Sequence, residues 1–321
     1  MNTGFLKSGH LPTLFAAFLY FDLSFMVWVI LGPLAVQIAP DLHLNAGQKG
    51  LMVAVPVLAG AVVRVVNGFL VDVVGPKLVG AACQIIVITG LLAAWWFGVH
   101  SFGAILIVGG VLGVAGASFA VALPLASRWY PPEHQGTALG IAGAGNSGTV
   151  LSALFAPSLA AWVGWNNGLG LACIPLALTL LTYLVCAKDS PTAPRAKSLA
   201  EYAAVLKTKD AWWFMFFYSV TFGGFVGLAS SLTIYFNDQY GLPAVTAGYF
   251  TAACVFAGSL VRPLGGSIAD RMGGVRTLTI MYCVAGSALV LVSAGLPRAW
   301  MALAVFILAM LALDAGNGAI F

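Results

Sequence analysis

The stretch GAVVRVVNGFLVDVVG, residues 60–75, returns later in the chain as GSLVRPLGGSIADRMG, residues 258–273. Glycine, arginine, glycine, aspartate and glycine recur at one constant offset, since 258 follows 60 by 198 positions. Five coincidences at polar or glycine positions are improbable in so apolar a sequence. We therefore predict that the chain contains two related halves, each carrying one copy of this stretch.

The composition around this repeat is that of a membrane protein. Of the 321 residues, 61% are hydrophobic and only 7% are charged, whereas soluble domains have about 25% charged residues. Lipid is therefore the expected solvent. The 14 Lys and Arg residues are scattered singly, most of them among the loops, without the basic cluster and interleaved aromatic residues that would indicate nucleic-acid binding. We expect a lipid bilayer, and no nucleic acid, as the partner.

Apolar stretches long enough to span a bilayer follow one another along the chain. About 20 apolar residues form one helical crossing, and ten such stretches predict an all-α membrane protein. The expected spans are 11–38, 50–71, 78–99, 102–127, 138–163, 167–187, 211–236, 245–269, 277–294 and 300–321.

The only long polar stretch divides these spans unequally. Residues 188–210 contain Pro191 and Pro194 and several charges, so we interpret them as a linker, helical in part over 199–206. The domains expected are a six-helix bundle (1–187), this linker (188–210) and a second bundle of four helices (211–321). The repeat pairs the fourth span with the tenth, and nothing follows to pair with spans five and six. We therefore expect that helices 11 and 12 are missing from this sequence.

The loop charges predict the orientation. With a cytoplasmic N-terminus, the cytoplasmic side carries Lys7, Lys77, Arg128, Lys188, Arg195, Lys197, Lys207, Lys209, Arg271 and Arg276. The opposite side carries only Lys49 and Arg298. This excess agrees with the positive-inside rule and predicts a multi-pass protein of the cell (inner) membrane.

Enzymatic chemistry is not expected. The five cysteines lie within or at the ends of apolar segments and include no CxxC pair, so they are interpreted as core residues rather than metal ligands. We found no metal-spaced histidines, nucleophile elbow or paired catalytic carboxylates in or near the spans. We predict no catalytic residues, no metal and no cofactor.

Two arginines, Arg64 and Arg262, lie inside spans at matched positions of the repeat. Arg64 precedes Asp72, at the cytoplasmic end of its span, by eight residues (72 − 64 = 8). This corresponds to about 12 Å along a helix and places Arg64 near mid-membrane. A cation there costs about 2.5 kcal/mol or more and usually faces an interior cavity. The alternatives are snorkelling to the headgroups or pairing with a buried acid.

Few acids are available for such pairing. Asp22 and Asp314 are the acids within apolar runs, and they could compensate Arg64 and Arg262 respectively. If neither does, a bound anion must supply the counter-charge. The planar guanidinium fork suits a planar oxyanion, such as nitrate, nitrite, bicarbonate or a small carboxylate. Homologous halves are also typical of transporters that bind substrate between them.

The loops after spans two and eight resemble the cytoplasmic signature of the major facilitator superfamily. They contain Gly68-x-x-x-Asp72-x-x-Gly75-x-Lys77 and Gly266-x-x-x-Asp270-Arg271-x-Gly273-x-x-Arg276. The resemblance implies a cytoplasmic gate in which these acidic and basic residues latch neighbouring helix ends. The first copy departs from the pattern, because Val73 stands where a cation is usual, and its latch is expected to be weaker.

Two glycine-rich segments resemble the nitrate/nitrite porter family of that superfamily. Span five contains Gly140-Ile-Ala-Gly143-Ala-Gly145-Asn146-Ser-Gly148, and span ten ends Asp314-Ala-Gly316-Asn317-Gly318-Ala-Ile-Phe321. Together with the arginines in spans two and eight, this resemblance covers essentially the whole chain. It implies secondary transport of nitrate and/or nitrite, by symport or antiport, as in nitrate assimilation.

The resemblance also implies roles for particular side chains. Asn146 and Tyr218 would donate hydrogen bonds to the anion, and Phe119 and Phe222 would sandwich it between their rings. For the two phenylalanines, lipid-facing or core positions are the plain alternative, and for Asn146 a helix–helix hydrogen bond. Close helix packing and sliding are expected of the glycines Gly143, Gly145, Gly148, Gly316 and Gly318.

Coupling to protons needs a titratable group, and Asp22 in span one is the candidate. A carboxyl group in lipid favours its neutral form, although a helix contact through Ser24 or the backbone is an equal alternative for Asp22. The main prediction is a nitrate/nitrite transporter, with protons as a second partner. Another small anion as substrate, or a non-transporting sensor or inactive fragment, remain the alternatives.

Overall fold

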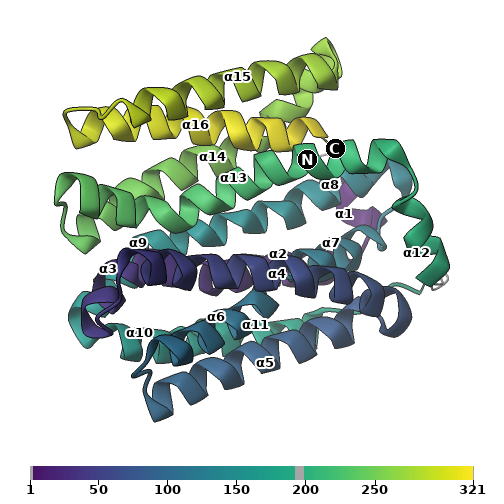
Figure 1. Ribbon diagram of the computed structural model, residues 1–321. Helices are drawn as coiled ribbons and strands as arrows, with labels where there is room; N and C mark the ends of the chain where they lie inside the picture. The colour runs from purple at the N-terminus through teal and green to yellow at the C-terminus, as the bar shows by residue number, and fades with distance from the viewer. Residues whose placement is uncertain (1–2, 192–198, 321) are drawn as a thin grey trace. The chain divides into compact units, whose positions relative to one another are not determined.

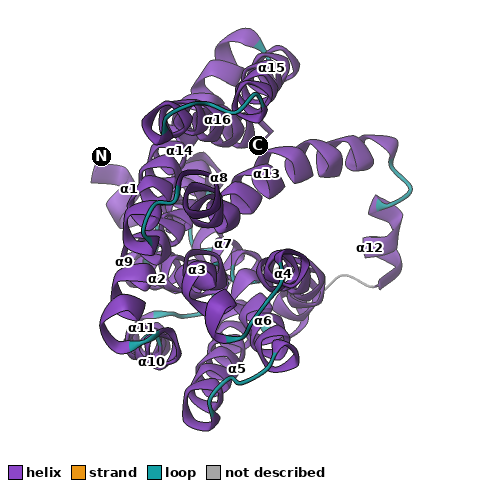
Figure 2. Cartoon of the chain, turned by 60° about the vertical axis from the view of Figure 1, so that its left-hand side comes forward, coloured by secondary structure: helices purple, strands orange, loops and turns teal. Residues whose placement is uncertain are grey.

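The computed structural model describes residues 3–191 and 199–320, and helices are the regular elements in these ranges (Figures 1 and 2). The earlier elements are α1 (Thr3–Ser8), α2 (Leu11–Trp28), α3 (Leu31–Asp41), α4 (Ala46–Val74), α5 (Pro76–Phe97), α6 (Phe102–Gly116), α7 (Phe119–Ser127), α8 (Pro132–Gly143), the 3₁₀ helix η1 (Ala144–Ser147), α9 (Gly148–Val163), α10 (Trp165–Leu171) and α11 (Cys173–Cys186). The later ones are α12 (Leu199–Val205), α13 (Lys209–Tyr240), α14 (Ala244–Met272), α15 (Gly274–Ser293) and α16 (Ala299–Ile320).

Ten helical stretches within the described residues are long and apolar enough to cross a bilayer. The predicted all-α membrane fold with ten spans is therefore confirmed. Some span ends differ from the prediction for local reasons. α13 runs past Phe236 to Tyr240, where Gly241 adopts a left-handed backbone (φ 64°) and ends the helix. Span five begins at Pro132 rather than Ala138, because proline is well suited to the first helical position.

The chain forms two compact units, Met1–Lys197 and Ser198–Phe321. In the first unit, α2 is the central helix and packs against α6, α7, α8, α9 and α11. Its aromatic side chains Tyr20, Phe21, Phe25 and Trp28 are each at most 2% exposed. This buried aromatic column fixes α2, and these five helices are positioned against it.

Several spans of the first unit are interrupted near their middle. Span four breaks at Ala117–Ser118 between α6 and α7, and span five contains the 3₁₀ turn η1 between α8 and α9. Such interruptions inside a helix often mark functional hinges. The first interruption lies beside Phe119 and the second contains Asn146, and both residues were predicted to bind the anion.

The second unit is built from α13, α14, α15 and α16, preceded by the short helix α12. Figure 1 shows α14 and α15 running alongside α16, in agreement with their packing. The repeat seen in the sequence corresponds to two helices of 29 residues each, since α4 (Ala46–Val74) and α14 (Ala244–Met272) start and end 198 positions apart. Gly75 and Gly273 end them with similar backbone angles, φ 99° and ψ 145° against φ 90° and ψ 139°.

Candidate anion-binding site

Arg64 is held on α4 by contacts within the first unit. Its Nη2 donates a hydrogen bond of 2.9 Å to the carbonyl oxygen of Gly116. The guanidinium carbon lies 5.3 Å from the ring centre of Phe119 and 5.9 Å from that of Trp28. These are cation–π distances, so the structure brings Arg64 and Phe119, both predicted site residues, together.

The break in span four supplies the acceptor for Arg64. The N–H of Ala120 donates to Ala117, three residues back, while the carbonyl of Gly116 accepts from Arg64. A helix terminus leaves carbonyl groups without intrahelical donors, and here an arginine side chain serves as the donor. The interruption at Ala117–Ser118 therefore holds the guanidinium group of Arg64 at the level of Gly116.

Trp28 is a residue that the sequence analysis missed. It is 2% exposed, and its Nε1 donates a 2.8 Å hydrogen bond to the carbonyl of Pro56. A β-carbon on Gly116 would lie 2.3 Å from the indole ring, so only glycine fits against it. A single tryptophan in an apolar span does not by itself indicate a binding site. Its role beside Arg64 depends on helix packing.

Asn146 lies in η1 and is 2% exposed. Neither the oxygen nor the nitrogen of its side-chain amide has a hydrogen-bond partner among the described residues, although its backbone carbonyl accepts from Thr149. Burying an amide without partners is costly. The helix–helix hydrogen bond considered as an alternative for Asn146 is therefore not formed among these residues.

The glycines of span five allow close contact with α2. A β-carbon on Gly145 would lie 2.7 Å from the Phe21 ring, and one on Gly148 would lie 1.7 Å from the carbonyl oxygen of Asp22. Gly143 is buried at the end of α8. At Gly145 and Gly148 the absence of a side chain is what permits these helices to approach.

Asp22 contacts the same segment through its side chain. Ser147 donates a 2.7 Å hydrogen bond from Oγ to the Asp22 carboxylate. The serine was not singled out in the sequence analysis, although it stands inside the glycine-rich motif of span five. Asp22 thus links α2 to η1, beside Asn146.

The remaining predicted site residues lie in the second unit. Tyr218 and Phe222 are one helical turn apart on α13, and their rings stack at 5.1 Å with an interplanar angle of 11°. Arg262 lies on α14, and Asp314 is buried on α16. Because the six residues divide between the two units, their convergence on one anion stays a prediction.

Glycines again permit the tightest helix contact in the second unit. A β-carbon on Gly318 would lie 2.0 Å from the carbonyl oxygen of Arg262, and one on Gly316 would lie 3.0 Å from Thr221. A β-carbon on Gly265 of α14 would lie 1.9 Å from the carbonyl oxygen of Ala315. α14 and α16 therefore touch backbone to backbone beside Arg262.

Of the residues proposed for a cytoplasmic gate, Asp72 is held by an ion pair. Arg128 at the end of α7 donates from Nη2 to its carboxylate. Lys77 donates from Nζ to the carbonyl of Leu184 at 3.0 Å. Arg128 had been counted only as a loop cation, yet it supplies the positive charge that Val73 does not. In the second unit, Asp270, Arg271 and Arg276 are exposed.

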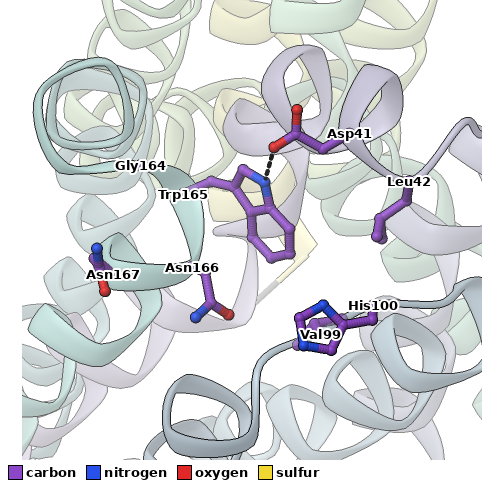
Figure 3. A pocket seen from close by; sticks show the side chains of 8 residues that line it. All are labelled: Asp41, Leu42, Val99, His100, Gly164, Trp165, Asn166 and Asn167. Atoms are coloured by element: carbon purple, nitrogen blue, oxygen red, sulfur yellow. Dashed lines mark hydrogen bonds between the residues drawn. The ribbon is translucent and has the colours of Figure 1, made fainter.

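A pocket elsewhere in the first unit is shown in Figure 3. It has a volume of about 490 Å³ and is lined by Asp41, Leu42, Val99, His100, Gly164, Trp165, Asn166 and Asn167. Figure 3 shows Trp165 pointing to Asp41, to which its Nε1 donates a 2.6 Å hydrogen bond. None of the predicted anion-site residues lines it.

Comparisons with known proteins place the chain in a family. Residues 14–321 match the family model described as Major Facilitator Superfamily. The "Probable nitrate/nitrite transporter NarK2" of Mycobacterium tuberculosis (strain ATCC 25618 / H37Rv) is 34% identical over 304 residues, which are 93% of this chain and 76% of that protein. The "Nitrite extrusion protein" of Bacillus subtilis (strain 168) is 32% identical over 260 residues, 81% of this chain and 65% of that protein.

Solved structures agree on the fold. A bacterial homolog of the human lysosomal transporter Spinster, in an inward-facing and occupied conformation, aligns with a TM-score of 0.73 at 21% identity. The alignment covers 98% of this chain and 74% of that one. The chain is a multi-pass membrane protein, and it belongs to the nitrate/nitrite porter family of the major facilitator superfamily.

Proposed function

We propose that this protein is a secondary transporter of nitrate and/or nitrite that works by alternating access. One observation carries the proposal. Arg64 and Arg262 occupy equivalent positions on the twin helices α4 and α14, in a chain whose relatives bear nitrate and nitrite transporter names. Repeat-related charges at the same depth suit a substrate held between two halves.

The anion is recognised by shape as well as by charge. The guanidinium groups of Arg64 and Arg262 offer paired N–H donors to a planar oxyanion. Phe119, already in contact with Arg64, covers one face of the ion, and Phe222 covers the other. Asn146 and Tyr218 donate further hydrogen bonds. For Asn146 the supporting observation is a buried amide whose polar atoms have no partner among the described residues.

The glycine contacts within each unit let its helices adjust as the two halves rock. Gly143, Gly145 and Gly148 in one unit, and Gly316 and Gly318 in the other, leave smooth helix surfaces that can slide. The cytoplasmic gate consists of Asp72 and Lys77 with their repeat counterparts Asp270, Arg271 and Arg276. Asp22 is the candidate proton-binding group in the first unit.

The topology follows from the loop charges. The N-terminus is cytoplasmic, residues 1–187 form the first bundle, 188–210 the cytoplasmic linker and 211–321 the second bundle, in the cell membrane. The linker includes residues 192–198, which lie outside the described part. We infer transport, with no catalytic reaction and no cofactor.

Nitrate binding to purified protein, measured by calorimetry, tests this proposal together with nitrate uptake into expressing cells. Arg64→Lys and Arg262→Lys keep the charge and lose the fork. Each is expected to weaken nitrate binding by about 10- to 100-fold, because a charge-assisted hydrogen bond contributes about 1.5–3 kcal/mol. Arg298→Lys, at an exposed position outside the spans, is the matched control and should bind like the unaltered protein.

Two outcomes contradict the proposal in different ways. Full nitrate binding by both lysine variants would refute recognition by the arginine forks. Thermal protection of the protein by bicarbonate or formate, but not by nitrate or nitrite, would identify a different small anion as the substrate. Binding without uptake would favour a sensor over a transporter.

A further inference from the structure

The pocket of Figure 3 lies at the ends of three spans and has no part in the proposed transport mechanism. It is found where α3 ends at Asp41, where the loop from α5 to α6 carries His100, and where α9 passes into α10 at Gly164. At the same ends of α5 and α9, Trp96 and Trp162 are 76% and 83% exposed. Tryptophan is enriched at the level of the lipid headgroups, so we infer that the pocket lies at the membrane interface.

The groups that line this pocket suit a cation. Trp165 is 7% exposed and donates from Nε1 to Oδ2 of Asp41 at 2.6 Å, and Oδ1 has no hydrogen-bond partner among the described residues. The amide of Asn166 donates to the carbonyl of Trp95 at 3.3 Å, but its own oxygen is buried and lacks a partner in the described part of the chain. A carboxylate, an amide oxygen and an indole ring together can bind an ammonium group, which donates hydrogen bonds and is attracted to aromatic rings.

An apolar groove of about 570 Å³ begins beside the pocket. It is bounded mainly by α5, α10 and α11, and Asn167 lines both the groove and the pocket. Trp95 joins the two spaces, because its indole donates to Asn167 at 3.0 Å and its carbonyl accepts from Asn166. Leu92 and Ile174, which line the groove, are 41% and 57% exposed. Exposed apolar side chains on membrane-spanning helices contact acyl chains, so the groove is open to lipid.

We propose that the pocket and the groove together bind one phospholipid whose headgroup carries an ammonium group, of the phosphatidylethanolamine type. The ammonium group binds Asp41, the Asn166 oxygen and the Trp165 ring. His100, which lines the same pocket, donates to the phosphate. One acyl chain lies in the groove.

The charge of the pocket selects the headgroup. Its lining, within the described residues, contains one carboxylate and no lysine or arginine. An anionic headgroup such as phosphatidylglycerol would place a second negative charge near Asp41 without a compensating cation. The ammonium of phosphatidylethanolamine supplies that cation. A bound lipid also links the ends of α3, α5 and α9, and any ligand that binds only the folded state stabilises it.

Native mass spectrometry of the purified full chain in a neutral detergent tests the headgroup preference. Phosphatidylethanolamine and phosphatidylglycerol with identical acyl chains are offered in equal amounts, and the first should be retained in preference by about three- to tenfold. Asp41→Asn keeps an oxygen that accepts from Trp165 and loses the charge, so it should retain the two lipids nearly equally. Asp238→Asn is the matched control, because it removes an exposed acid of α13 that lines neither space. It should keep the preference.

Three results of this experiment would overturn the proposal. The unaltered protein could retain the two lipids equally or retain neither. The preference could survive in Asp41→Asn. It could also be lost to the same degree in Asp238→Asn, which would make it an effect of net charge rather than of this pocket.

A second experiment tests the groove. Ala177 lines it, and a tryptophan there would occupy the space of the acyl chain, so Ala177→Trp should retain less phosphatidylethanolamine. Leu178→Trp is the control at the next residue of α11, which is 62% exposed and lies outside the groove. Unchanged retention by Ala177→Trp, or an equal loss in the control, would overturn the role of the groove.

The last arm distinguishes a lipid from a soluble amine. Phosphatidylethanolamine should raise the unfolding temperature of the unaltered protein, whereas glycerophosphoethanolamine, the same headgroup without acyl chains, should not do so at the same concentration. Equal protection by both compounds would overturn the lipid proposal in favour of a soluble amine. These measurements use no nitrate, so their outcome is independent of the proposed transport function.

Discussion

Gly148 lies so close to Asp22 that a β-carbon on the glycine would be 1.7 Å from the aspartate carbonyl oxygen. Gly148 is the first residue of α9 and directly follows the 3₁₀ turn that contains Asn146. The backbone of α9 thus touches the backbone of α2 at this residue. The same aspartate accepts a hydrogen bond from Ser147 through its side chain. The position of the turn relative to α2 is therefore fixed by one glycine and one carboxylate.

Gly148→Ala is expected to destabilise the first unit. A methyl group has no space against the Asp22 carbonyl, and overpacking of this kind costs about 1–3 kcal/mol. The apparent unfolding temperature in detergent, followed by intrinsic fluorescence, should fall by several degrees. Gly140→Ala is the matched control in the same span, because nothing lies within 4 Å of its β-carbon. There alanine should be neutral or stabilising by up to about 1 kcal/mol. Equal behaviour of the two variants would contradict the close contact.

Loss of the Asp72–Arg128 ion pair should destabilise the protein measurably. The two side chains are only 21% and 16% exposed, so the pair is shielded from solvent, and a charge-assisted hydrogen bond there contributes about 1.5–3 kcal/mol. Asp72→Asn and Arg128→Gln should each lower the unfolding temperature, and the double variant should lose less than the sum. Asp270→Asn, at the exposed repeat counterpart, should change stability by less than about 0.5 kcal/mol. Fully additive losses would show that the pair does not form.

Asn146→Leu should separate binding from stability. Leucine has a similar volume and removes a buried amide that lacks partners among the described residues, so the unfolding temperature should stay the same or rise. Nitrate binding should weaken, because a donor to the anion is lost. Asn67→Leu is the comparison: Asn67 is 3% exposed, but its amide donates to the sulfur of Cys83. That variant should lose stability and keep nitrate binding. A strongly destabilised Asn146→Leu would assign Asn146 a structural role instead.

The start of α2 should be sensitive to acid through His10. Its Nδ1 accepts a 3.2 Å hydrogen bond from the backbone N–H of Thr13 and thus caps the helix, which requires the unprotonated ring nitrogen. Burial, followed by the charge of Lys188, lowers the pKa of His10 below its usual value. The stabilising contribution of His10 is thus present above its unfolded pKa, and it is lost as the pH falls through the folded pKa.

A pH series of unfolding temperatures checks this sign. His10→Asn supplies a cap that does not titrate. The unaltered protein should therefore lose stability relative to this variant as the pH falls below the normal range of histidine. A difference that does not change between pH 8 and pH 5 would exclude a titrating cap.

Much of the fold could be predicted from the sequence because each membrane helix corresponds to a long apolar run. Span four was predicted at 102–127 and is observed at Phe102–Ser127, since Ser101 caps its start and a polar loop follows its end. Where a predicted helix end differs from the observed one by a few residues, a glycine with positive φ ends the helix. The end of α14 at Met272, for example, is set by the positive φ of Gly273, which hydropathy does not report.

Partners of the candidate residues were harder to predict. Asp72 was predicted to take part in a latch between neighbouring helix ends, but its partner Arg128 at the end of α7 was not predicted, because helix packing brings together helix ends that are distant in the sequence. The interruption of span four at Ala117–Ser118 is likewise absent from the hydropathy pattern, and it is this interruption that frees the Gly116 carbonyl for Arg64.

The sequence by itself determined that the chain spans a bilayer ten times and that it contains a repeat with one arginine inside a span in each copy. Both follow from local rules: lipid requires apolar runs, and a charge in such a run is conspicuous. Only the tertiary structure decided what surrounds each arginine. Arg64 lies against Trp28, Phe119 and a carbonyl group, whereas Arg262 lies where the backbone of α14 touches that of α16 at Gly318. Neighbours across helices depend on rotation and close approach at glycines, which a one-dimensional pattern does not contain.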